Sequence, residues 1–538
     1  MKVKLICCLL ALCFLIGCAG PKTDDGEPAL PDIDENAYGG TELVARPAAD
    51  NVFSLNFDPT AGTNPIRVTN ATNLLIAPLI YEFLFYVDED FNTSTVTSGL
   101  VTDYRTDDFI WWTFTIDTTH SFSDGSPLTA KDIAYSIRVA QQSDYYASHL
   151  RDVYGASDLG DGTLAVSVNK ANSQLPAMLN IPIIPYGAYN EEFPLGSGPY
   201  QLSATHGALV LNEANSRAGD MPVDRIYLRD YMDPTERITA FEEGLLDLVT
   251  NDPAGMYNLG YGSVKETRYY DTTNLHYIGF NTRGNYFQSY LVRCAVGYLV
   301  DRDYVVKGLM NGYGAAAALP CHPRSPLYDA EYAARFTYDP EMAATLFREG
   351  GVDDLDDDGK LEILVTGIIV ELNIKFIVNT DSSVKVTAAR RITDELNALG
   401  ITTTLYELDW DEYLYALNNG DFDMYYGELR LPVDWDIRPL FDVPSESARR
   451  QGLWGMNYSR TTDPAYSAAY DAYLAADETE RYQKFQDASH YVVDSGFLIP
   501  ICFERREMLT HRDVVGGAHP TQWDLFNRFD EWTINLES

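Results

Sequence analysis

The sequence predicts an α/β protein with two lobes. Its 538 residues are too many for one ordinary hydrophobic core, so at least two domains are expected. One stretch past the middle of the chain alternates strand and helix patterns, and this β-α-β-α-β order predicts a parallel sheet covered by helices. Its strands are expected at Leu372–Asn379, Ile401–Leu408 and Asp421–Glu428. Two more buried strands, Leu275–Asn281 and Phe497–Phe503, are predicted to carry the chain from one lobe to the other and back.

The segment after the first crossing strand is predicted to be helical. Apolar residues recur at helical spacing in Gln288–Val300, which indicates an amphipathic helix. Asp301 is suited to cap a second helix, Arg302–Leu309, and Asn311-Gly312 is expected to end it.

Other elements are predicted from alternation, helical periodicity and caps. In Phe109–Asp117 every second residue is apolar, which is typical of a half-buried strand. Thr129 and Asp132 have the spacing of a capping box at the start of a helix. The remaining expectations are strands at Leu43–Leu55 and Thr163–Val168, and helices at Leu74–Phe85, Ala130–Gln141, Ala465–Ala476 and Thr479–Asp494, with another starting at Asp233.

The charge of the chain limits its partners. The formal net charge is −40 and the isoelectric point is about 4.4. Binding to nucleic acid requires Lys and Arg against the phosphates, so nucleic acid is not an expected partner. Peripheral binding to anionic lipid headgroups is disfavoured for the same reason.

The N-terminus has the pattern of a secretory signal. Lys2 and Lys4 precede a short apolar segment, Leu5–Ile16, which is too short to span a bilayer. It ends in Leu-Ile-Gly-Cys, which resembles the bacterial lipobox, so we expect cleavage before Cys18 and a lipid on its sulfur. A plain secretory signal or an anchor helix are the alternatives. Residues 18–41 are rich in Pro and acidic residues and are expected to form a disordered tether.

Four motifs resemble those of the family 5 extracellular solute-binding proteins. These are G-F-N-T followed by V-R-C-A-x-x-Y-L-V-D-R-x-Y-V in Gly279–Val305, F-S-D-G-S-P-L-T-A-K-D in Phe122–Asp132, G-S-G-P-Y in Gly196–Tyr200, and G-L-L-D-L in Gly244–Leu248. The resemblance extends from about Leu43 to Thr533. Members of this family are the peptide-, nickel- and oligosaccharide-binding subunits of ABC importers.

The resemblance implies a two-lobed periplasmic-binding-protein type II fold with an extra subdomain and two crossover strands as its hinge. It implies that the lobes are discontinuous in sequence. We expect a signal peptide at 1–17, the tether at 18–41, the first lobe at 42–65, 196–280 and 500–538, the extra subdomain at 66–195, and the second lobe at 281–499.

Catalytic and metal motifs are sparse. The sequence contains no G-x-S-x-G, H-E-x-x-H or C-x-x-C, so we expect neither an enzyme nor a cofactor. Asp354, Asp356 and Asp358 have the D-x-D-x-D-G spacing of a calcium loop. Position 12 of that loop is Val365 instead of Glu, so they are weak candidates.

The loop after the third strand of the β-α-β-α-β segment is the predicted ligand site. In peptide-binding members of the family the matching loop carries an Asp that pairs with the α-ammonium of the ligand. The resemblance implies this role for Asp434 or Asp436, whereas charges on a solvated loop are the alternative. Trp454 is a candidate stacking wall or a core residue. The further candidate binding residues are Glu428, Arg430, Trp435 and Asn73.

The resemblance therefore implies a substrate-binding lipoprotein that captures oligopeptides and delivers them to a membrane permease, as a monomer tethered through Cys18. An oligosaccharide is the alternative ligand, and a nickel complex is the third. A secreted hydrolase or a ligand sensor is the alternative of another class.

Overall fold

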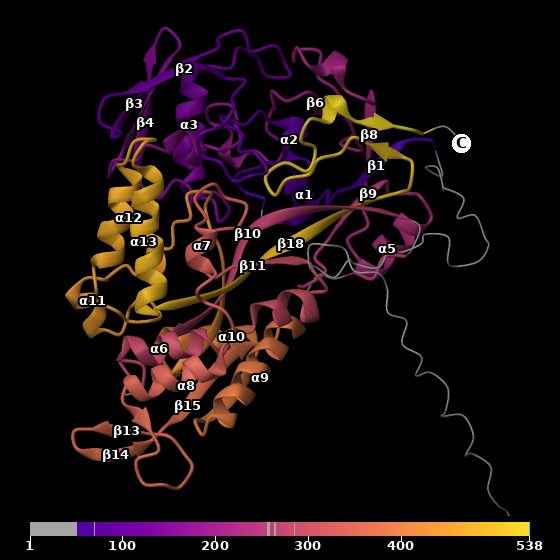
Figure 1. Ribbon diagram of the computed structural model, residues 1–538. Helices are drawn as coiled ribbons and strands as arrows, with labels where there is room; N and C mark the ends of the chain where they lie inside the picture. Colours follow the sequence, from indigo (N-terminus) through magenta and orange to yellow (C-terminus); the bar gives the residue numbers. More distant parts are fainter. Residues whose placement is uncertain (1–50, 69, 256–258, 263–264, 285, 537–538) are drawn as a thin grey trace, which may run out of the picture. The chain divides into compact units, whose positions relative to one another are not determined.

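Two long strands cross the middle of the structure. The computed structural model describes residues 51–68, 70–255, 259–262, 265–284 and 286–536. Strand β10, Glu266–Phe280, pairs antiparallel with β18, Leu498–Thr510 (Figure 1). Both predicted crossing strands are confirmed. Both extend beyond the predicted limits, because charged and half-exposed residues interrupt the apolar pattern on which the prediction depends.

The crossing strands lie inside one large mixed sheet, in the order β16-β15-β17-β10-β18-β9-β1-β8-β7-β6, and β11 also pairs with β18. We call the strands beyond β18, with α5, the first lobe, and those beyond β10, with their helices, the second lobe. The first-lobe strands are β9 (Leu248–Asn251), β1 (Phe53–Asn56), β8 (Arg225–Arg229), β7 (Ala208–Leu211) and β6 (Tyr200–Leu202); β11 is Gly314–Ala316.

The second lobe contains the predicted β-α-β-α-β unit. Strand β15 (Asn373–Asn379) pairs in parallel with β16 (Thr402–Leu408) and with β17 (Met424–Arg430). Helices α9 (Ser383–Ala398) and α10 (Trp410–Asn419) connect them. The prediction is confirmed. The carboxyl ends of these parallel strands lie at one edge of the sheet, where ligands bind in open α/β folds.

A separate four-stranded antiparallel sheet lies between β1 and the rest of the first lobe in sequence. Its strand order is β2-β3-β5-β4, and helix α3 contacts β4 and β5. Asp132 accepts a hydrogen bond from the backbone N–H of Thr129 at 2.9 Å, so the predicted capping box is present. The bounds are β2 Val101–Thr106, β3 Trp111–Ile116, α3 Ala130–Ala140, β4 Val153–Gly160 and β5 Thr163–Val168.

Shorter elements complete three hydrophobic cores. One extends over the four-stranded sheet and the first lobe and includes buried residues of α10 and of the helices between β17 and β18; the second lies within the second lobe; and a small third core packs α5 against β9 and β18. The helices are α1 Ala71–Leu75, α2 Ala77–Ile80, α4 Leu175–Met178, α5 Pro234–Glu242, α6 Tyr290–Gly297, α7 Ala330–Ala333, α8 Pro340–Glu349, α11 Glu446–Arg450, α12 Ala465–Leu474 and α13 Arg481–Ser495. The strands are β12 Val352–Asp353, β13 Glu362–Val365, β14 Ile368–Glu371, β19 Val515–Gly516 and β20 Thr533–Ile534.

Two of the sequence motifs hold the scaffold together. Arg293, of the V-R-C-A motif, is buried and donates to the backbone oxygens of Phe287 and Ser495 at 2.7 Å. It thereby ties α6 to the end of α13. Gly196, of the G-S-G-P-Y motif, lies so close to α2 that a Cβ would stand 1.9 Å from the backbone oxygen of Ile80. Both motifs thus serve the packing of the scaffold.

Several predicted elements differ from the structure. The helix expected at Leu74–Phe85 is wrong in its second half, because the chain breaks into α1 and α2 and turns extended from Tyr81. The segment expected as helix Arg302–Leu309 is a six-residue π-helix, Tyr304–Leu309. The first strand covers only Phe53–Asn56 in the described part of the chain.

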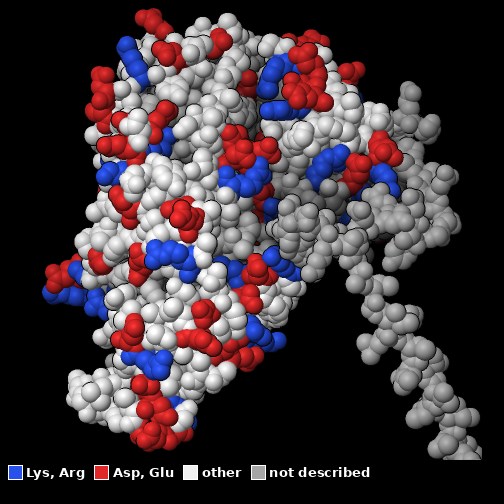
Figure 2. All heavy atoms as spheres, viewed as in Figure 1, with Lys and Arg blue, Asp and Glu red and all other residues white. Residues whose placement is uncertain are grey.

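The structure leaves some predictions open. The signal peptide, Cys18 and the tether lie outside the described residues. No helix among the residues described is long and apolar enough to cross a membrane. The lobe boundaries remain a prediction, although the four-stranded sheet falls within the range given for the extra subdomain. Figure 2 shows acidic and basic side chains interspersed over the visible face, without a large basic patch.

Candidate functional site

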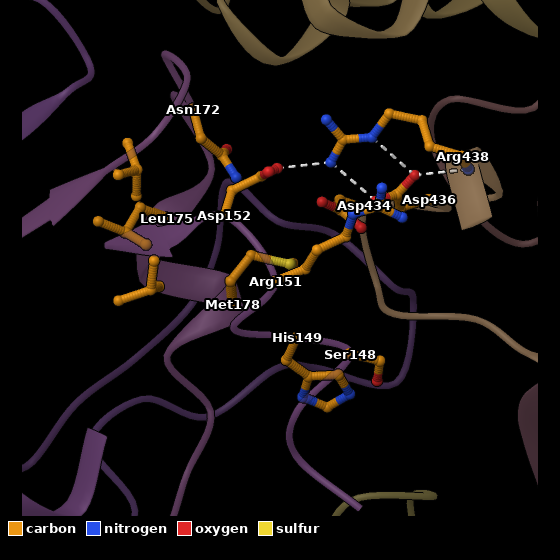
Figure 3. A pocket seen from close by; sticks show the side chains of 12 residues that line it. Ser148, His149, Arg151, Asp152, Asn172, Leu175, Met178, Asp434, Asp436 and Arg438 are labelled. Carbon is orange, nitrogen blue, oxygen red and sulfur yellow. Dashed lines mark hydrogen bonds and ion pairs between the residues drawn. The ribbon is translucent and has the colours of Figure 1, made fainter. Parts of the chain in front are cut away.

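The loop after β17 and the segment before β4 enclose a small cavity (Figure 3). Asp434, Asp436 and Arg438 come from the loop, and the segment before β4 faces them. The cavity therefore lies between the four-stranded sheet and the second lobe. The lining residues are Ser148, His149, Arg151, Asp152, Val153, Val168, Asn172, Leu175, Met178, Asp434, Asp436 and Arg438.

Asp434 carries the unusual feature of this cavity. Its side chain is 3% exposed, and its Oδ1 has no hydrogen-bond partner among the described residues. Burial, followed by the negative charge of Asp436, raises the pKa of the Asp434 carboxyl to about 7, although Arg438 opposes the shift. A buried carboxylate oxygen without a donor costs free energy. The site is thus short of a donor and of a positive charge.

Arg438 is committed to other carboxylates. Its guanidinium donates to Asp436 at 2.9 and 2.8 Å, to Asp152 at 2.5 Å and to Asp471 at 3.0 Å. It is 3% exposed. Asp436 and Asp152 therefore have a cation, whereas Asp434 does not. Of the two predicted ammonium partners, Asp434 has a free oxygen and Asp436 is held in an internal ion pair.

The cavity has one polar and one apolar side. The carboxylates and Arg438 lie together in Figure 3, while Leu175 and Met178 of α4 lie across the cavity from them. A small cationic group with an apolar substituent matches both sides.

Trp435 keeps the loop in place. Its backbone φ is +63°, in the left-handed region, so the chain turns sharply between the two aspartates. Its ring is buried against Phe91 and Phe503, and its indole N–H donates to the Oγ of Ser325 at 3.2 Å. The candidate Trp435 is therefore a packing residue in this structure.

Glu428 and Arg430 lie at the end of β17, away from the lining of the cavity. Glu428 accepts a hydrogen bond from Lys385 Nζ at 2.9 Å. The guanidinium of Arg430 lies 3.8 Å from the ring centroid of Tyr145, and its Nη2 is buried without a hydrogen-bond partner.

The structure does not bring Trp454 and Asn73 to the cavity. The guanidinium carbon of Arg283 lies over the ring of Trp454, 5.4 Å from the ring centroid. Asn73 is buried and bonds backbone groups of Asp58 at 2.8 Å and Gly62 at 2.7 Å. These bonds hold the turn after β1.

Sequence reasoning missed the half of the site that comes from the extra subdomain. His149, Asp152 and Asn172 line the cavity from segments nearly 300 residues before Asp434. No local motif marks them, because their only shared property is spatial proximity.

The predicted calcium loop is a hairpin turn between β12 and β13. Ligand atoms of Asp354, Asp356, Asp358 and Glu362 lie within 4.8 Å of one another. The carboxylate of Asp354 already accepts backbone N–H groups of Asp358 and Gly359 at 3.0 Å. The three aspartates remain the weak calcium candidates of the sequence analysis.

Residues 95–436 match the family of bacterial extracellular solute-binding proteins, family 5 (middle). That match covers more than half of the sequence. The chain belongs to this family. It is 21% identical to the oligopeptide-binding protein AppA of Bacillus subtilis (strain 168) over 550 residues, which cover 97% of this chain and 96% of that protein.

Solved structures share the fold. The B. subtilis oligopeptide-binding protein AppA in complex with a nonapeptide has a TM-score of 0.61 and 19% identity, covering 90% of this chain and 98% of that one. NikZ of Campylobacter jejuni in complex with Ni(L-His) has a TM-score of 0.66 and 18% identity, covering 90% and 99%. These similarities confirm the predicted two-lobed periplasmic-binding-protein fold.

Proposed function

We propose that this chain is the substrate-binding subunit of an ABC importer, which captures an oligopeptide between its lobes and delivers it to a membrane permease. Membership of the solute-binding family supports the binding role. One observation carries the choice of ligand: Asp434 has a buried carboxylate oxygen without a donor beside a cavity. The α-ammonium of a peptide supplies a positive charge and N–H donors together.

The ligand alternatives differ in what they offer Asp434. A relative of this fold was solved with Ni(L-His), so a nickel complex remains the second candidate. An oligosaccharide offers hydroxyl donors without charge and leaves the carboxylate uncompensated. The absence of the sequence motifs of hydrolases supports a binding protein over an enzyme.

The location follows from the sequence prediction at the N-terminus. We propose that Cys18 carries a lipid that holds a monomer at the outer face of the cell membrane. Metabolic labelling with a fatty acid analogue tests this. Label is expected on the natural chain and absent from Cys18→Ser, and a labelled variant contradicts the proposal.

The peptide proposal is tested with the mature chain from Cys18 onward. Thermal-shift screening against peptides of two to eight residues, oligosaccharides and Ni²⁺ finds the ligand class, because a ligand at 100 times its Kd adds about 2.7 kcal/mol of stability. We expect peptides to stabilise the protein. If only sugars or Ni²⁺ do so, the peptide proposal fails.

A double-mutant cycle then tests the role of Asp434. The best peptide and its N-acetylated form are titrated by calorimetry against the natural chain, Asp434→Asn and Asp356→Asn. Removing one partner of a buried charge pair costs about 2–5 kcal/mol, so either change is expected to weaken binding at least about 30-fold. In Asp434→Asn, acetylating the peptide is expected to weaken binding little further, because the partner of its ammonium is already absent. The exposed Asp356 provides the control, and equal binding by Asp434→Asn contradicts the assignment.

A further inference from the structure

A second group of charged side chains lies on and beside the crossing strands, apart from the Asp434 cavity. Asp252, His276 and Glu504 are buried, Arg506 is half-buried and Glu428 is exposed. We call Asp252, His276, Glu428, Glu504 and Arg506 the hinge cluster. Asp252 follows β9, His276 is on β10, Glu428 on β17, and the other two are on β18. Both lobes and both crossing strands thus contribute to it.

The hinge cluster lies where ligands bind in this class of fold. Asp252 follows the carboxyl end of a first-lobe strand, and Glu428 lies near the carboxyl end of a parallel second-lobe strand. Just after Asp252, the backbone oxygen of Ala254 accepts a hydrogen bond from Ser382 Oγ, before α9 of the second lobe, at 3.0 Å. The lobes therefore meet beside the cluster.

Negative charge is in excess there. His276 Nε2 donates to the Glu504 carboxylate at 2.9 Å, and the Asn274 amide donates to the same carboxylate at 2.8 Å. Burial opposes the charge of Glu504, but the hydrogen bond and the charge of His276 lower its pKa to about 2. Lys385 is held between Asp381 at 2.6 Å and Glu428 at 2.9 Å. Burial opposes the charge of His276, but the hydrogen bond and the charge of Glu504 raise its pKa. The four carboxylates around the cluster therefore face the permanent cations Lys385 and Arg506 and the protonated His276, which leaves one negative charge in excess.

Asp252 is the carboxylate of the hinge cluster whose charge and hydrogen-bonding capacity these cations satisfy only in part. It is 8% exposed, and its Oδ1 has no hydrogen-bond partner among the described residues. Arg506 stands 3.5 Å from its Oδ2 and 3.6 Å from Glu504, which are loose contacts for a guanidinium. Burial and the charge of Glu504 raise the pKa of Asp252 to about 6. Like Asp434, it has one oxygen without a donor among the described residues.

Aromatic residues lie near the two carboxylates. Burial raises the pKa of the half-buried Tyr270 to about 12, and the charge of Asp252 adds to this shift while Arg506 opposes it. The ring of Tyr145 in turn carries the guanidinium of Arg430, four residues before Asp434. Tyrosine faces and guanidinium groups suit the apolar stems and carbonyl oxygens of an extended chain.

We infer that Asp252, with Glu504, forms a second cation-binding subsite, so that the ligand carries a primary ammonium or guanidinium group in addition to the one at Asp434. The inference rests on the proposed function and narrows it to peptides with a basic side chain. In the filled subsite the ligand group donates to Asp252 Oδ1 and offsets the excess negative charge. An acidic side chain at this position is repelled.

The test uses calorimetry on the mature chain with a tetrapeptide series. All-Ala is compared with peptides in which one position at a time is Lys, norleucine, acetyl-lysine or Glu. We expect Lys at one position to tighten binding at least tenfold over norleucine and acetyl-lysine. We expect Asp252→Asn to reduce this Lys preference over all-Ala, norleucine and acetyl-lysine to less than threefold. Asp356→Asn, with the same charge loss on the surface, should keep the preference.

The outcomes separate this inference from the proposed function. If tetrapeptides bind but Lys gives no advantage at any position, or Glu binds better, the second subsite is wrong and the peptide function stands. Equal losses for all-Ala and Lys peptides in Asp252→Asn also overturn it. The comparison of Lys with acetyl-lysine on the natural chain needs no variant, so a misfolded variant cannot obscure the result. If cadaverine binds at Asp434 and Asp252 while no tetrapeptide binds, the second cation-binding subsite stands. The proposal that the ligand is a peptide is then wrong.

Discussion

Replacing Asp434 by Asn is expected to stabilise the ligand-free protein, although it removes the proposed ligand anchor. The side chain is buried, its Oδ1 lacks a donor, and its pKa is raised from 3.8 to about 7, first by burial. At pH 8 the folded protein therefore holds a buried charge that the unfolded chain exposes to water. Asn keeps the shape and removes the charge.

The shift sets the size of the effect. About three pKa units correspond to an upper limit of about 4 kcal/mol. The Asn amide also lacks partners at this position, which returns part of the gain, so we expect about 1–3 kcal/mol. The folded pKa lies above the unfolded one, so the folded state binds more protons between pH 4 and pH 7. Proton binding therefore stabilises the folded natural chain at low pH, and this stabilisation is lost as the pH rises through that window. The free energy of unfolding that Asp434→Asn gains over the natural chain grows from near zero at pH 4 to its full size at pH 8.

Urea unfolding at pH 4.5, 6 and 8 measures this difference. Asp356→Asn, an exposed acid in the hairpin turn, is the matched control and is expected to stay within about 0.5 kcal/mol. If Asp434→Asn is less stable than the natural chain at pH 8, the carboxylate has a partner in the ligand-free protein and the reasoning fails. A gain that is the same at every pH is equally inconsistent with a buried charge.

Four further outcomes are expected. Peptide affinity measured by calorimetry should be highest between about pH 7 and 8. Below this range it should fall up to about tenfold per pH unit as Asp434 binds a proton, and above it the affinity should fall because the peptide α-amino group, with a free pKa of about 8, loses its proton; a flat profile from pH 5.5 to 8 contradicts this. Arg438→Met leaves the buried Asp436 and the half-buried Asp152 without a cation and should cost about 3–5 kcal/mol in urea unfolding; unchanged stability refutes it. Gly196→Ala places a Cβ against the backbone of α2 and should lower the free energy of unfolding, measured with urea, by about 2 kcal/mol. Gly219→Ala has open space around its Cβ and should cost less than half as much. Equal costs refute the packing argument. Adding about 1 mM Ca²⁺ to metal-stripped protein should move the Tm by less than about 1 °C. The reason is that Asp354 already accepts backbone N–H groups, and Val365 stands where a calcium loop has its bidentate Glu. A larger rise establishes calcium binding at the hairpin turn.

The scaffold was largely predictable because its signals are local. The β-α-β-α-β unit of the second lobe and the capping box at Thr129 depend on periodicity and spacing within a few residues. The failures have local causes as well. The helix expected up to Phe85 ends early because the chain breaks around Ile76 and then turns extended, and apolar composition alone does not distinguish a buried helix from a buried extended segment.

The site was predictable only in part. Resemblance pointed to Asp434 or Asp436 without choosing between them. The choice depends on Arg438, which holds Asp436 and leaves an oxygen of Asp434 without a partner. It depends equally on Asp152, which comes from the other side of the cavity and shares the same guanidinium.

By itself, then, the sequence determined the fold class, the crossing strands, the family resemblance and a short loop as the place of the proposed site. The tertiary structure decided how each carboxylate is buried and paired, and it leaves one buried oxygen of Asp434 and one of Asp252 without a donor among the described residues. The physical reason is that burial and ion pairing are properties of neighbours distant in sequence. A chain with 79 acidic residues gives no local sign of which few will lose water without gaining a cation.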